Sequence, residues 1–332
     1  MLNWQGPGLS LLRAAASLIH ASVSHRPSIK PAALRPGDTI GVVAPAAAID
    51  RDHLQRGVDF LRAQGYRVAL APHVLCKDRV LAGTDAQRAQ DVTAMFADPA
   101  IKAIMAARGG YGAGRILPLL DYAALTATPK IFLGYSDLTF LLNALWERTG
   151  LICFHGPVVA KDLSHGIEGE AARHLRHLLG GELEGFALEG RQTIHPGQAQ
   201  GRLIGGCLSI LVAMLGTPYA PDFAGRILFL EDTGERAYRI DRMLVQLKQA
   251  GALAQVAGIV VGGMKAPGGS ADEQRLIGEF IAEQTAALGV PVMDGIDAGH
   301  GTGNFTLPIG AMARLDAGGK RLEILECPVM RN

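Results

Sequence analysis

A serine, a histidine and a carboxylate in this sequence could together hydrolyse a peptide or ester bond. Ser136 follows the apolar run "KIFLGY" at 130–135 and precedes a helical repeat of leucines, so it lies at an abrupt strand-to-helix turn. A serine hydroxyl is a weak nucleophile unless a base takes its proton, and that base is usually a histidine oriented by a carboxylate. Ser136 is therefore a candidate nucleophile if the chain also supplies those two partners.

The segment around Ser136 also has a purely structural interpretation. Serine is a common helix N-cap, and Asp137 would interact favourably with the positive end of a helix that begins there. The segment departs from the G-x-S-x-G pattern of a nucleophile elbow after the serine. However, Gly134 forces a sharp turn off the strand, and the first amides of the helix would point at an oxyanion formed beside the hydroxyl. The segment alone leaves both interpretations open.

His300 is the candidate base among the 10 histidines. It lies in "DGIDAGHGTGNFTLPIG", where several glycines permit close backbone approach, and Phe305, Leu307 and Ile309 predict a strand just after it. Four other histidines fall in charged segments and are predicted to be exposed: His53, His165, His174 and His177. The alternative for His300 is a solvated histidine in a flexible turn.

Glu231 is the candidate carboxylate because it directly ends the apolar strand "RILFLE", and active sites of α/β proteins gather at the carboxyl ends of strands. Competing carboxylates are Asp232, Asp294 and Asp297. Glu231 could instead face solvent and pair with Arg236 or Arg239. The chain order serine, glutamate, histidine is that of α/β hydrolases.

A glycine-rich loop, "ARGGYGAGRILPLLD" at 107–121, follows one predicted strand and precedes a helix. The dinucleotide pattern G-x-G-x-x-G fails here because Arg115 stands where the third glycine is needed, and no G-K-[ST] follows. The backbone amides of Gly109 and Gly110 suit an oxyanion hole better.

The apolar periodicity predicts an α/β fold with two domains. From residue 36, strands near 39–46, 66–72, 101–110 and 130–135 alternate with helices, including one over 113–124. This order predicts a doubly wound, mostly parallel, flavodoxin- or Rossmann-like sheet. The second half has strands at 226–231, 256–263 and 321–326, and helices near 207–215, 238–250 and 271–288, which predict a mixed α/β domain ending in a hairpin.

The predicted organisation along the chain has four parts. They are an N-terminal extension at 1–35, expected to be poorly ordered, an α/β domain at 36–165 carrying the serine, a connection at 166–200, and a domain at 201–332 carrying the glutamate and histidine. Because the three residues are divided between the domains, the active site must form between them.

The composition limits the classes of molecule that this protein is expected to bind. A net charge of +1 over 332 residues gives no electrostatic bias toward nucleic acid or membrane surfaces, and no apolar run could span a bilayer. The 4 cysteines lie far apart without zinc-ligand spacing, so neither a disulfide framework nor a structural metal is indicated. A reducing compartment fits the cysteine content best.

Residues 1–30 make a poor signal peptide because Arg13 and His20 interrupt the apolar run.

Seven blocks in order resemble the LD-carboxypeptidase family of serine peptidases, which includes muramoyltetrapeptide carboxypeptidase and the microcin C immunity peptidases. They are "GDTIGVVAPA", "LAGTDAQRAQD", "ARGGYGAGRILPLLD", "IFLGYSDLTFLLNAL", "GRLIGGCLSIL", "ILFLEDTGERAYRIDRMLVQL" and "GIDAGHGTGNFTLPIGAMARLD". The resemblance spans about residues 36–327, and residues 1–35 have no counterpart in it. The "EDTGERAYRIDR" segment looks more like the murein-recycling branch than the microcin-immunity branch.

The resemblance assigns roles to particular residues. It implies Ser136 as nucleophile, Glu231 and His300 as its partners, and the amides of Gly110 and Asp137 as the oxyanion hole, with no metal and no cofactor. The implied reaction is hydrolysis of the L,D-peptide bond before the terminal D-alanine of a murein tetrapeptide, in peptidoglycan recycling. A homodimer is expected from the family, and a cytoplasmic location is expected from the reducing compartment that the cysteines favour.

A carboxypeptidase must also hold the free carboxylate of its substrate, and a guanidinium is suited to that task. Arg108 is the first candidate, followed by Arg239 and Arg242, and Gly109 and Tyr111 complete the predicted substrate-binding residues. These arginines could instead form ordinary surface ion pairs.

Three alternatives for the function stay open at this stage. The chain could be a microcin C-type immunity peptidase, or an α/β-hydrolase esterase that needs no free carboxylate in its substrate. It could also be a non-catalytic nucleotide- or sugar-binding protein in which Ser136 is a helix cap.

Overall fold

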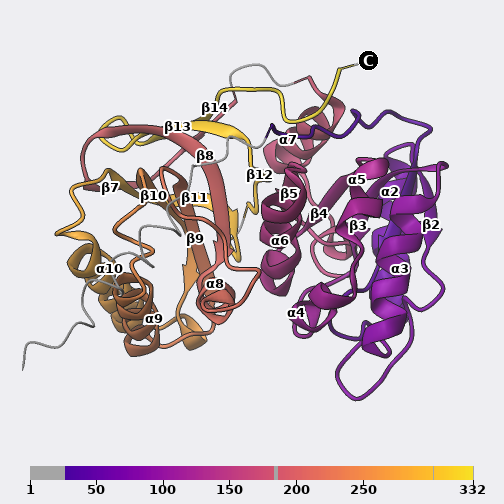
Figure 1. The fold of residues 1–332 in the computed structure, drawn as a ribbon, viewed down its shortest axis with the longest axis horizontal. Coiled ribbons are helices and arrows are strands. Elements are labelled where there is room, and N and C mark those ends of the chain that lie inside the picture. Colours follow the sequence, from indigo (N-terminus) through magenta and orange to yellow (C-terminus); the bar gives the residue numbers. More distant parts are fainter. Residues whose placement is uncertain (1–26, 183–185, 302, 332) are drawn as a thin grey trace, which may run out of the picture.

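The computed structural model describes residues 27–182, 186–301 and 303–331. These residues form two β-sheets with helices packed against them, one sheet in each half of the molecule (Figure 1). The predicted α/β class, with a mostly parallel first sheet and a mixed second one, is confirmed.

The first sheet is parallel except at one edge. Its strands, in spatial order, are β12 (Leu307–Ile309), β5 (Cys153–His155), β4 (Ile131–Gly134), β3 (Ile101–Ala106), β1 (Thr39–Val43) and β2 (Arg67–Leu70). Only β12 runs antiparallel, against β5. Strands β1, β3, β4 and β5 are almost entirely buried, as expected for a sheet covered on both faces. Their carboxyl ends share one edge, where ligands of such sheets bind.

The helices of the first half begin in different ways, some with a side-chain cap and some without one. They are α2 (Arg51–Ala63), α3 (Asp85–Ala97), α4 (Ala113–Ile116), α5 (Tyr122–Ala127) and α6 (Thr139–Thr149). The Asp50 side chain caps α2, and Thr84 with Gln87 forms a reciprocal capping box on α3. The helix predicted over 113–124 is instead divided into α4, the 3₁₀ turn η1 (Leu117–Leu119) and α5. Pro118 lies inside η1 and has no N–H to continue the helix.

The second sheet is mixed. Its strands, in spatial order, are β6 (Ala187–Glu189), β14 (Arg321–Ile324), β13 (Met312–Asp316), β8 (Gln198–Cys207), β9 (Ile227–Thr233), β10 (Gly258–Lys265), β11 (Val292–Gly299) and β7 (Gln192–His195). Strands β8, β9, β10 and β11 are parallel to one another. Strands β13 and β14 form the predicted terminal hairpin. The remaining elements are α7 (Gly169–Gly180), α8 (Leu208–Met214), α9 (Ala237–Gln249), α10 (Ala271–Thr285) and the 3₁₀ turns η2 (Ser136–Leu138), η3 (Leu163–His165) and η4 (Pro267–Gly269).

The chain crosses from the second half to the first near its end. Strand β11 ends at Gly299 in the second sheet, whereas β12 pairs with β5 in the first sheet. The prediction that 201–332 forms a separate domain did not include this crossing. Its consequence is that the segment containing His300 is anchored at one end in each sheet.

The two halves pack closely where α6 meets β8, near the centre of Figure 1. The Asn143 side chain accepts the N–H of Gly205 and donates to its carbonyl, at 3.2 and 3.0 Å. The Thr139 hydroxyl accepts the N–H of Cys207 at 3.0 Å. Cys207 is in turn paired in register with Glu231. The helix that starts beside Ser136 is thus hydrogen-bonded to the strand adjacent to Glu231.

Gly206 provides a test of this contact. Its φ is 134°, and an added Cβ would lie 2.5 Å from Thr139 Oγ1. We expect Gly206→Ala to lower the free energy of unfolding by about 2–4 kcal/mol, because it combines an unfavourable backbone angle with a steric clash, and to reduce turnover as the halves separate. The matched control is Gly216→Ala, where φ is also positive (75°) but no atom lies within 4 Å. Equal losses of stability in the two variants, measured by urea unfolding, would show that the contact is unimportant.

Two predicted boundaries differ from the structure. The predicted connection at 166–200 contains α7, β6 and β7, whose strands form the two edges of the second sheet. The predicted extension at 1–35 is in part packed: Ala33 and Leu34 are buried, and Lys30 pairs with Glu326. The expectation of poor order for residues 1–26 lies outside the described residues.

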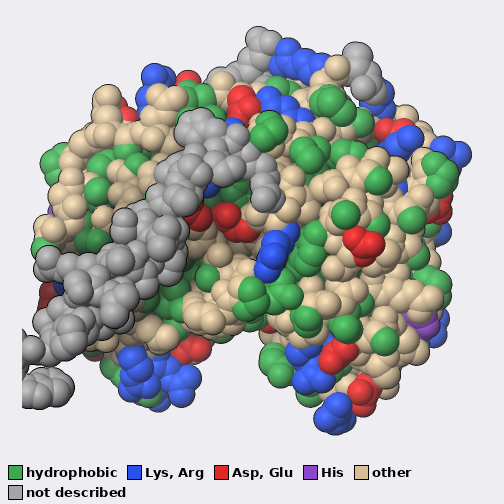
Figure 2. Space-filling view, in the orientation of Figure 1, with side chains coloured by type: hydrophobic (Ala, Val, Ile, Leu, Met, Phe, Trp, Pro, Cys, Tyr) green, Lys and Arg blue, Asp and Glu red, His purple; other side chains and the backbone are tan. Residues whose placement is uncertain are grey.

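Within the described part of the chain, no helix is both long and apolar enough to cross a membrane. Figure 2 shows acidic and basic side chains spread over the visible face rather than collected in one patch, in keeping with the net charge of +1. A notch separates the two halves along the lower edge of that view.

Candidate active site

Ser136 has a backbone conformation that is unusual for a residue other than glycine. Its φ is 64°, in the left-handed region that costs an L-residue about 1–2 kcal/mol. Tyr135, not Ser136, is the N-cap residue of η2, and Leu138 is that of α6, so the helix-cap interpretation of Ser136 is wrong. A strained serine between a buried parallel strand and a helix is the geometry of a nucleophile elbow.

The glycine-rich loop lies directly against this turn. A Cβ added to Gly109 would be 2.9 Å from the Ser136 Cβ and 3.2 Å from the Asp137 nitrogen, so only glycine fits there. Gly110 has a φ of 99°, and its N–H has no hydrogen-bond partner among the described residues. The loop therefore brings backbone amides close to Ser136, as an oxyanion hole requires.

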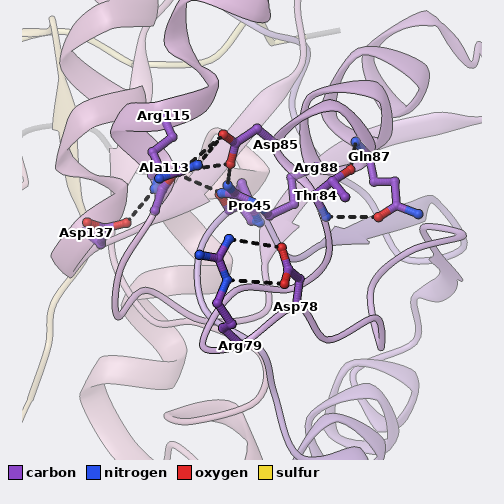
Figure 3. A network of polar contacts seen from close by, with 11 residues as sticks. Pro45, Asp78, Arg79, Thr84, Asp85, Gln87, Arg88, Ala113, Arg115 and Asp137 are labelled. Atoms are coloured by element: carbon purple, nitrogen blue, oxygen red, sulfur yellow. Dashed lines mark hydrogen bonds and ion pairs between the residues drawn. The ribbon is translucent and has the colours of Figure 1, made fainter.

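The Asp137 side chain has a structural task of its own. It is buried and accepts the N–H of Ala113 at 2.7 Å, so it interacts with the start of α4 rather than with its own helix as predicted. Figure 3 shows the network that continues from there: the buried Arg88 donates to the carbonyls of Pro45 and Gly112, at 2.6 and 2.8 Å, and pairs with Asp85. Arg115 also binds Asp85. The network fixes the glycine-rich loop relative to the turn at Ser136.

Glu231 and His300 form a buried pair. The Nδ1 atom of His300 lies 2.6 Å from Oε2 of Glu231, and the backbone N–H of His300 donates to the same oxygen at 3.0 Å. Glu231 is fully buried, so its predicted alternative as a solvent-facing strand end is wrong. A Cβ on Gly299 would lie 2.5 Å from Glu231 Cγ, which explains the glycine that precedes the histidine.

The competing carboxylates have other partners. Asp232 is buried and accepts the N–H groups of Ser209 and Thr233, at 2.7 and 2.8 Å. Asp297 pairs with Arg191, and Asp294 is a separate carboxylate whose pKa is raised by burial. Glu231 is thus the member of this group that contacts His300.

The electrostatics of the pair keep the glutamate ionised. Burial alone raises the pKa of Glu231, but the contacts from His155 and His300 outweigh it and lower the pKa to about 2. An ionised carboxylate on Nδ1 fixes the proton of His300 on that atom, which leaves Nε2 free to act as a base. Burial, assisted by Glu231, raises the pKa of Cys207 well above its usual range, so this neighbouring thiol stays protonated.

This lowered pKa predicts how stability depends on pH. Because the folded-state pKa lies below the ordinary value of 4.5, the ionised carboxylate stabilises the native state fully above about pH 5, and this contribution is lost as the pH falls toward 2. We expect the difference in unfolding free energy between the parent and Glu231→Gln to shrink from pH about 5.5 to pH about 3. Urea unfolding at both pH values measures it. A difference that does not change with pH would contradict the assignment.

Tyr135 connects the serine turn with the histidine. Its ring centroid is 4.8 Å from that of His300 and 5.8 Å from that of His155. Its hydroxyl donates to Asp162 and accepts from Lys161, at 3.1 and 2.9 Å. His300 is therefore packed on the residue that directly precedes Ser136.

The sequence is recognised along most of its length by two family models. The LD-carboxypeptidase N-terminal domain matches residues 40–156, and the LD-carboxypeptidase C-terminal domain matches residues 200–315. A probable murein peptide carboxypeptidase of Bacillus subtilis is 38% identical over 295 residues, covering 88% of this chain and 92% of that protein. The chain belongs to the LD-carboxypeptidase family. It is a serine-type carboxypeptidase by this membership.

Solved structures agree with the family at the level of the whole fold. A muramoyltetrapeptide carboxypeptidase from Oxalobacter formigenes superposes with a TM-score of 0.78 at 29% identity, over 87% of this chain and 99% of that one. The microcin C7 self-immunity protein in complex with aspartyl sulfamoyl adenosine superposes with a TM-score of 0.83 at 27% identity, over 91% and 100%. Proteins named for two different substrates thus share the fold of this LD-carboxypeptidase.

The predicted substrate-binding residues of this LD-carboxypeptidase differ in how free their side chains are to bind a ligand. Arg108 is exposed and donates to the carbonyl of Ala48 at 3.4 Å. Tyr111, in the same loop, is 55% exposed. Arg239 on α9 already faces the Glu235 carboxylate at 3.4 Å, and Arg242 lies over the ring of Tyr238.

Two buried histidines were not anticipated. His174, predicted to be exposed, is buried against Phe186 and Phe305, and its Nε2 lies 2.9 Å from the Thr306 carbonyl. His155 was not selected at all, although it ends a buried strand in "CFH" just as Glu231 ends one. Its Nε2 lies 3.6 Å from Oε1 of Glu231.

A cavity of about 900 Å³ lies in the second half, between β7, β10, β11 and α10. Its lining includes Gly301, next to His300, but none of Ser136, Glu231 and His300. Over the described ranges, no group of three or more histidine, cysteine or acidic side chains is arranged to hold a metal ion.

Proposed function

We propose that this LD-carboxypeptidase removes the C-terminal D-alanine from murein tetrapeptide, with Ser136, His300 and Glu231 as its catalytic triad. The observation that supports this most is the buried hydrogen bond between Glu231 and His300, packed on the residue that precedes Ser136. The names of the Bacillus subtilis and Oxalobacter formigenes proteins support a murein peptide as substrate.

The proposed chemistry is acyl transfer through the serine. His300 Nε2 takes the proton of the Ser136 hydroxyl as its oxygen attacks the carbonyl carbon that precedes D-alanine. The amides of Gly110 and Asp137 stabilise the oxyanion, and Glu231 stabilises the imidazolium that forms. The imidazolium then gives its proton to the leaving amine, so D-alanine departs and an ester to Ser136 remains. Water, activated by the same imidazole, hydrolyses that ester.

The proposed ligand of the terminal carboxylate is Arg108. It lies beside Gly109, which packs on Ser136, and a guanidinium carries five N–H donors of which one is directed to Ala48. Arg239 is less suited because the Glu235 carboxylate already faces it. Tyr111, exposed in the same loop, would contact the last residues of the peptide.

One panel of substrates tests the reaction class. The purified protein is incubated separately with murein tetrapeptide, aspartyl sulfamoyl adenosine and p-nitrophenyl acetate, each with and without EDTA. We expect D-alanine release from the tetrapeptide at a kcat/KM well above that for the other two, unaffected by EDTA. Preferred hydrolysis of the sulfamoyl nucleoside would favour the immunity-peptidase alternative, and preferred hydrolysis of the ester would favour an esterase. No turnover of any substrate would leave the binding-protein alternative.

A further inference from the structure

His155 occupies a fixed position on the far side of Glu231 from His300. It ends β5 in the first sheet, paired in register with Gly134 on β4 and Leu307 on β12. Its side chain is fully buried, with its ring edge-on to Tyr135 and Phe229, at centroid distances of 5.8 and 5.1 Å. These two aromatic rings leave the imidazole little freedom to turn away from the carboxylate.

Three buried polar atoms at this place have no hydrogen-bond partner among the described residues: His155 Nδ1, His155 Nε2 and Glu231 Oε1. A buried polar atom without a partner destabilises the folded state, so such atoms are rare in native proteins. Two of these three, Nε2 and Oε1, face each other at 3.6 Å. A movement of less than about 1 Å would bring them to ordinary hydrogen-bond distance and satisfy both.

We propose that His155 is a positioning residue for the peptidase reaction, whose Nε2–H donates to Oε1 of Glu231 and holds the carboxylate so that Oε2 receives His300. This inference rests on the proposed function, because it assigns His155 a task in orienting the proposed triad. Each oxygen of the carboxylate then has its own imidazole. A carboxylate held at both oxygens cannot rotate about its last bond, so the ring of His300 keeps the orientation that directs Nε2 toward Ser136.

The position of His155 in the fold gives this contact a second consequence. His155 belongs to the first sheet, whereas Glu231 belongs to the second, so their hydrogen bond crosses between the halves. Gly134, the register partner of His155, lies two residues before Ser136. The carboxylate is therefore oriented from the sheet that carries the nucleophile, and the triad is correctly arranged only when the two halves are docked.

The experiment compares three replacements of His155. Glutamine can place its amide nitrogen near the position of Nε2, asparagine reaches only the position of Nδ1, and phenylalanine keeps the ring shape without a donor. We expect His155→Phe and His155→Asn to lower kcat by about 10- to 100-fold with KM changed less than about twofold, since Oε1 of Glu231 is then left without a donor to hold the carboxylate in place. His155→Gln should remain within about threefold of the parent because it restores the donor.

The pH profile provides a readout that a merely structural residue would not change. The other titratable groups facing Glu231 are His300, Cys207, Asp232 and, through its ring, Tyr135. Removing the His155 donor from the ionised carboxylate of Glu231 raises the pKa of that carboxylate and strengthens its attraction for the protonated, inactive form of the His300 imidazole. The acid limb of the kcat profile should therefore move to higher pH in His155→Phe and stay in place in His155→Gln.

A matched control is His195→Phe, which removes a half-buried histidine that contacts Thr285 on the opposite edge of the second sheet. Its kcat and acid limb should equal those of the parent. If His155→Phe does not fold, the Gln and Asn variants decide the matter. Equal kcat and equal pH profiles in those two variants would overturn the proposal. The comparison uses whichever panel substrate the parent hydrolyses, so failure of the murein assignment and failure of this inference are separate results.

Discussion

Ser136→Ala is expected to lower kcat for D-alanine release by about 10⁴- to 10⁶-fold, the range found when the nucleophile of a serine peptidase is removed. Without the hydroxyl no acyl-enzyme can form, and only the amides near Gly110 and the bound substrate remain to assist attack by water. KM should change little, because the carboxylate-binding group and the loop stay in place. Initial rates from a coupled D-amino-acid oxidase assay measure both parameters.

Two controls separate loss of chemistry from loss of structure. Ser270→Ala removes a serine that caps α10 and should keep the parent rate. Ser136→Gly should be as inactive as Ser136→Ala but more stable than it by about 1–2 kcal/mol, because glycine accepts the φ of 64° without strain. Ser136→Ala that keeps more than a hundredth of the parent rate would contradict the assignment of the nucleophile.

His300→Ala is expected to lower kcat by about as much as Ser136→Ala does, about 10⁴- to 10⁶-fold, because the serine then has no base. The double variant should be no slower than either single one, since residues that act in the same step lose their effect together. The same assay measures all three variants. Losses that multiply in the double variant would mean that His300 and Ser136 act independently, and so would exclude a shared triad.

The sequence predicted a site residue where a chemically reactive side chain stood in a recognisable local pattern of strand, turn or glycines. Ser136 at a strand-to-helix junction, Glu231 at a strand end and His300 among glycines could each be selected from short segments. His155 could not be selected in this way, because its task depends on pairing between sheets that no local pattern encodes. Like Glu231, His155 ends an apolar strand. That position was the available sign of a role in the site.

The side chain of Asp137 illustrates another limit. Its sequence position suggests interaction with the helix that follows it, but it binds the start of α4, 24 residues earlier. The carboxylate of Asp137 would be stabilised at the N-terminus of either helix, so the attraction between a carboxylate and a helix N-terminus does not predict which helix it binds. The tertiary contact decides, because burial beside the glycine-rich loop gives Asp137 a nearby N–H of Ala113 to accept.

The fold was predictable where strands were apolar and helices periodic, and less so elsewhere. Strand β8 was missed because "QAQGRLIGGC" mixes polar residues and glycines, and its glycines are required by close packing against Thr139 and Phe229. Strand β11 was missed for a similar reason, since "VMDGIDAG" breaks the apolar pattern. The return of β12 to the first sheet could not be inferred, because a three-residue strand carries almost no topological information.

The proposed mechanism requires that Ser136 becomes acylated during turnover. A tetrapeptide analogue with D-lactate in place of the terminal D-alanine tests this most directly, because an ester acylates a serine faster than an amide does and the acyl-enzyme accumulates. The reaction is quenched in acid and the protein is mapped by mass spectrometry. We predict a tripeptide acyl group on the peptide that contains Ser136, which disappears once the substrate is consumed. An acyl group on any other residue, or turnover of the analogue with no acyl group on Ser136, would contradict the account.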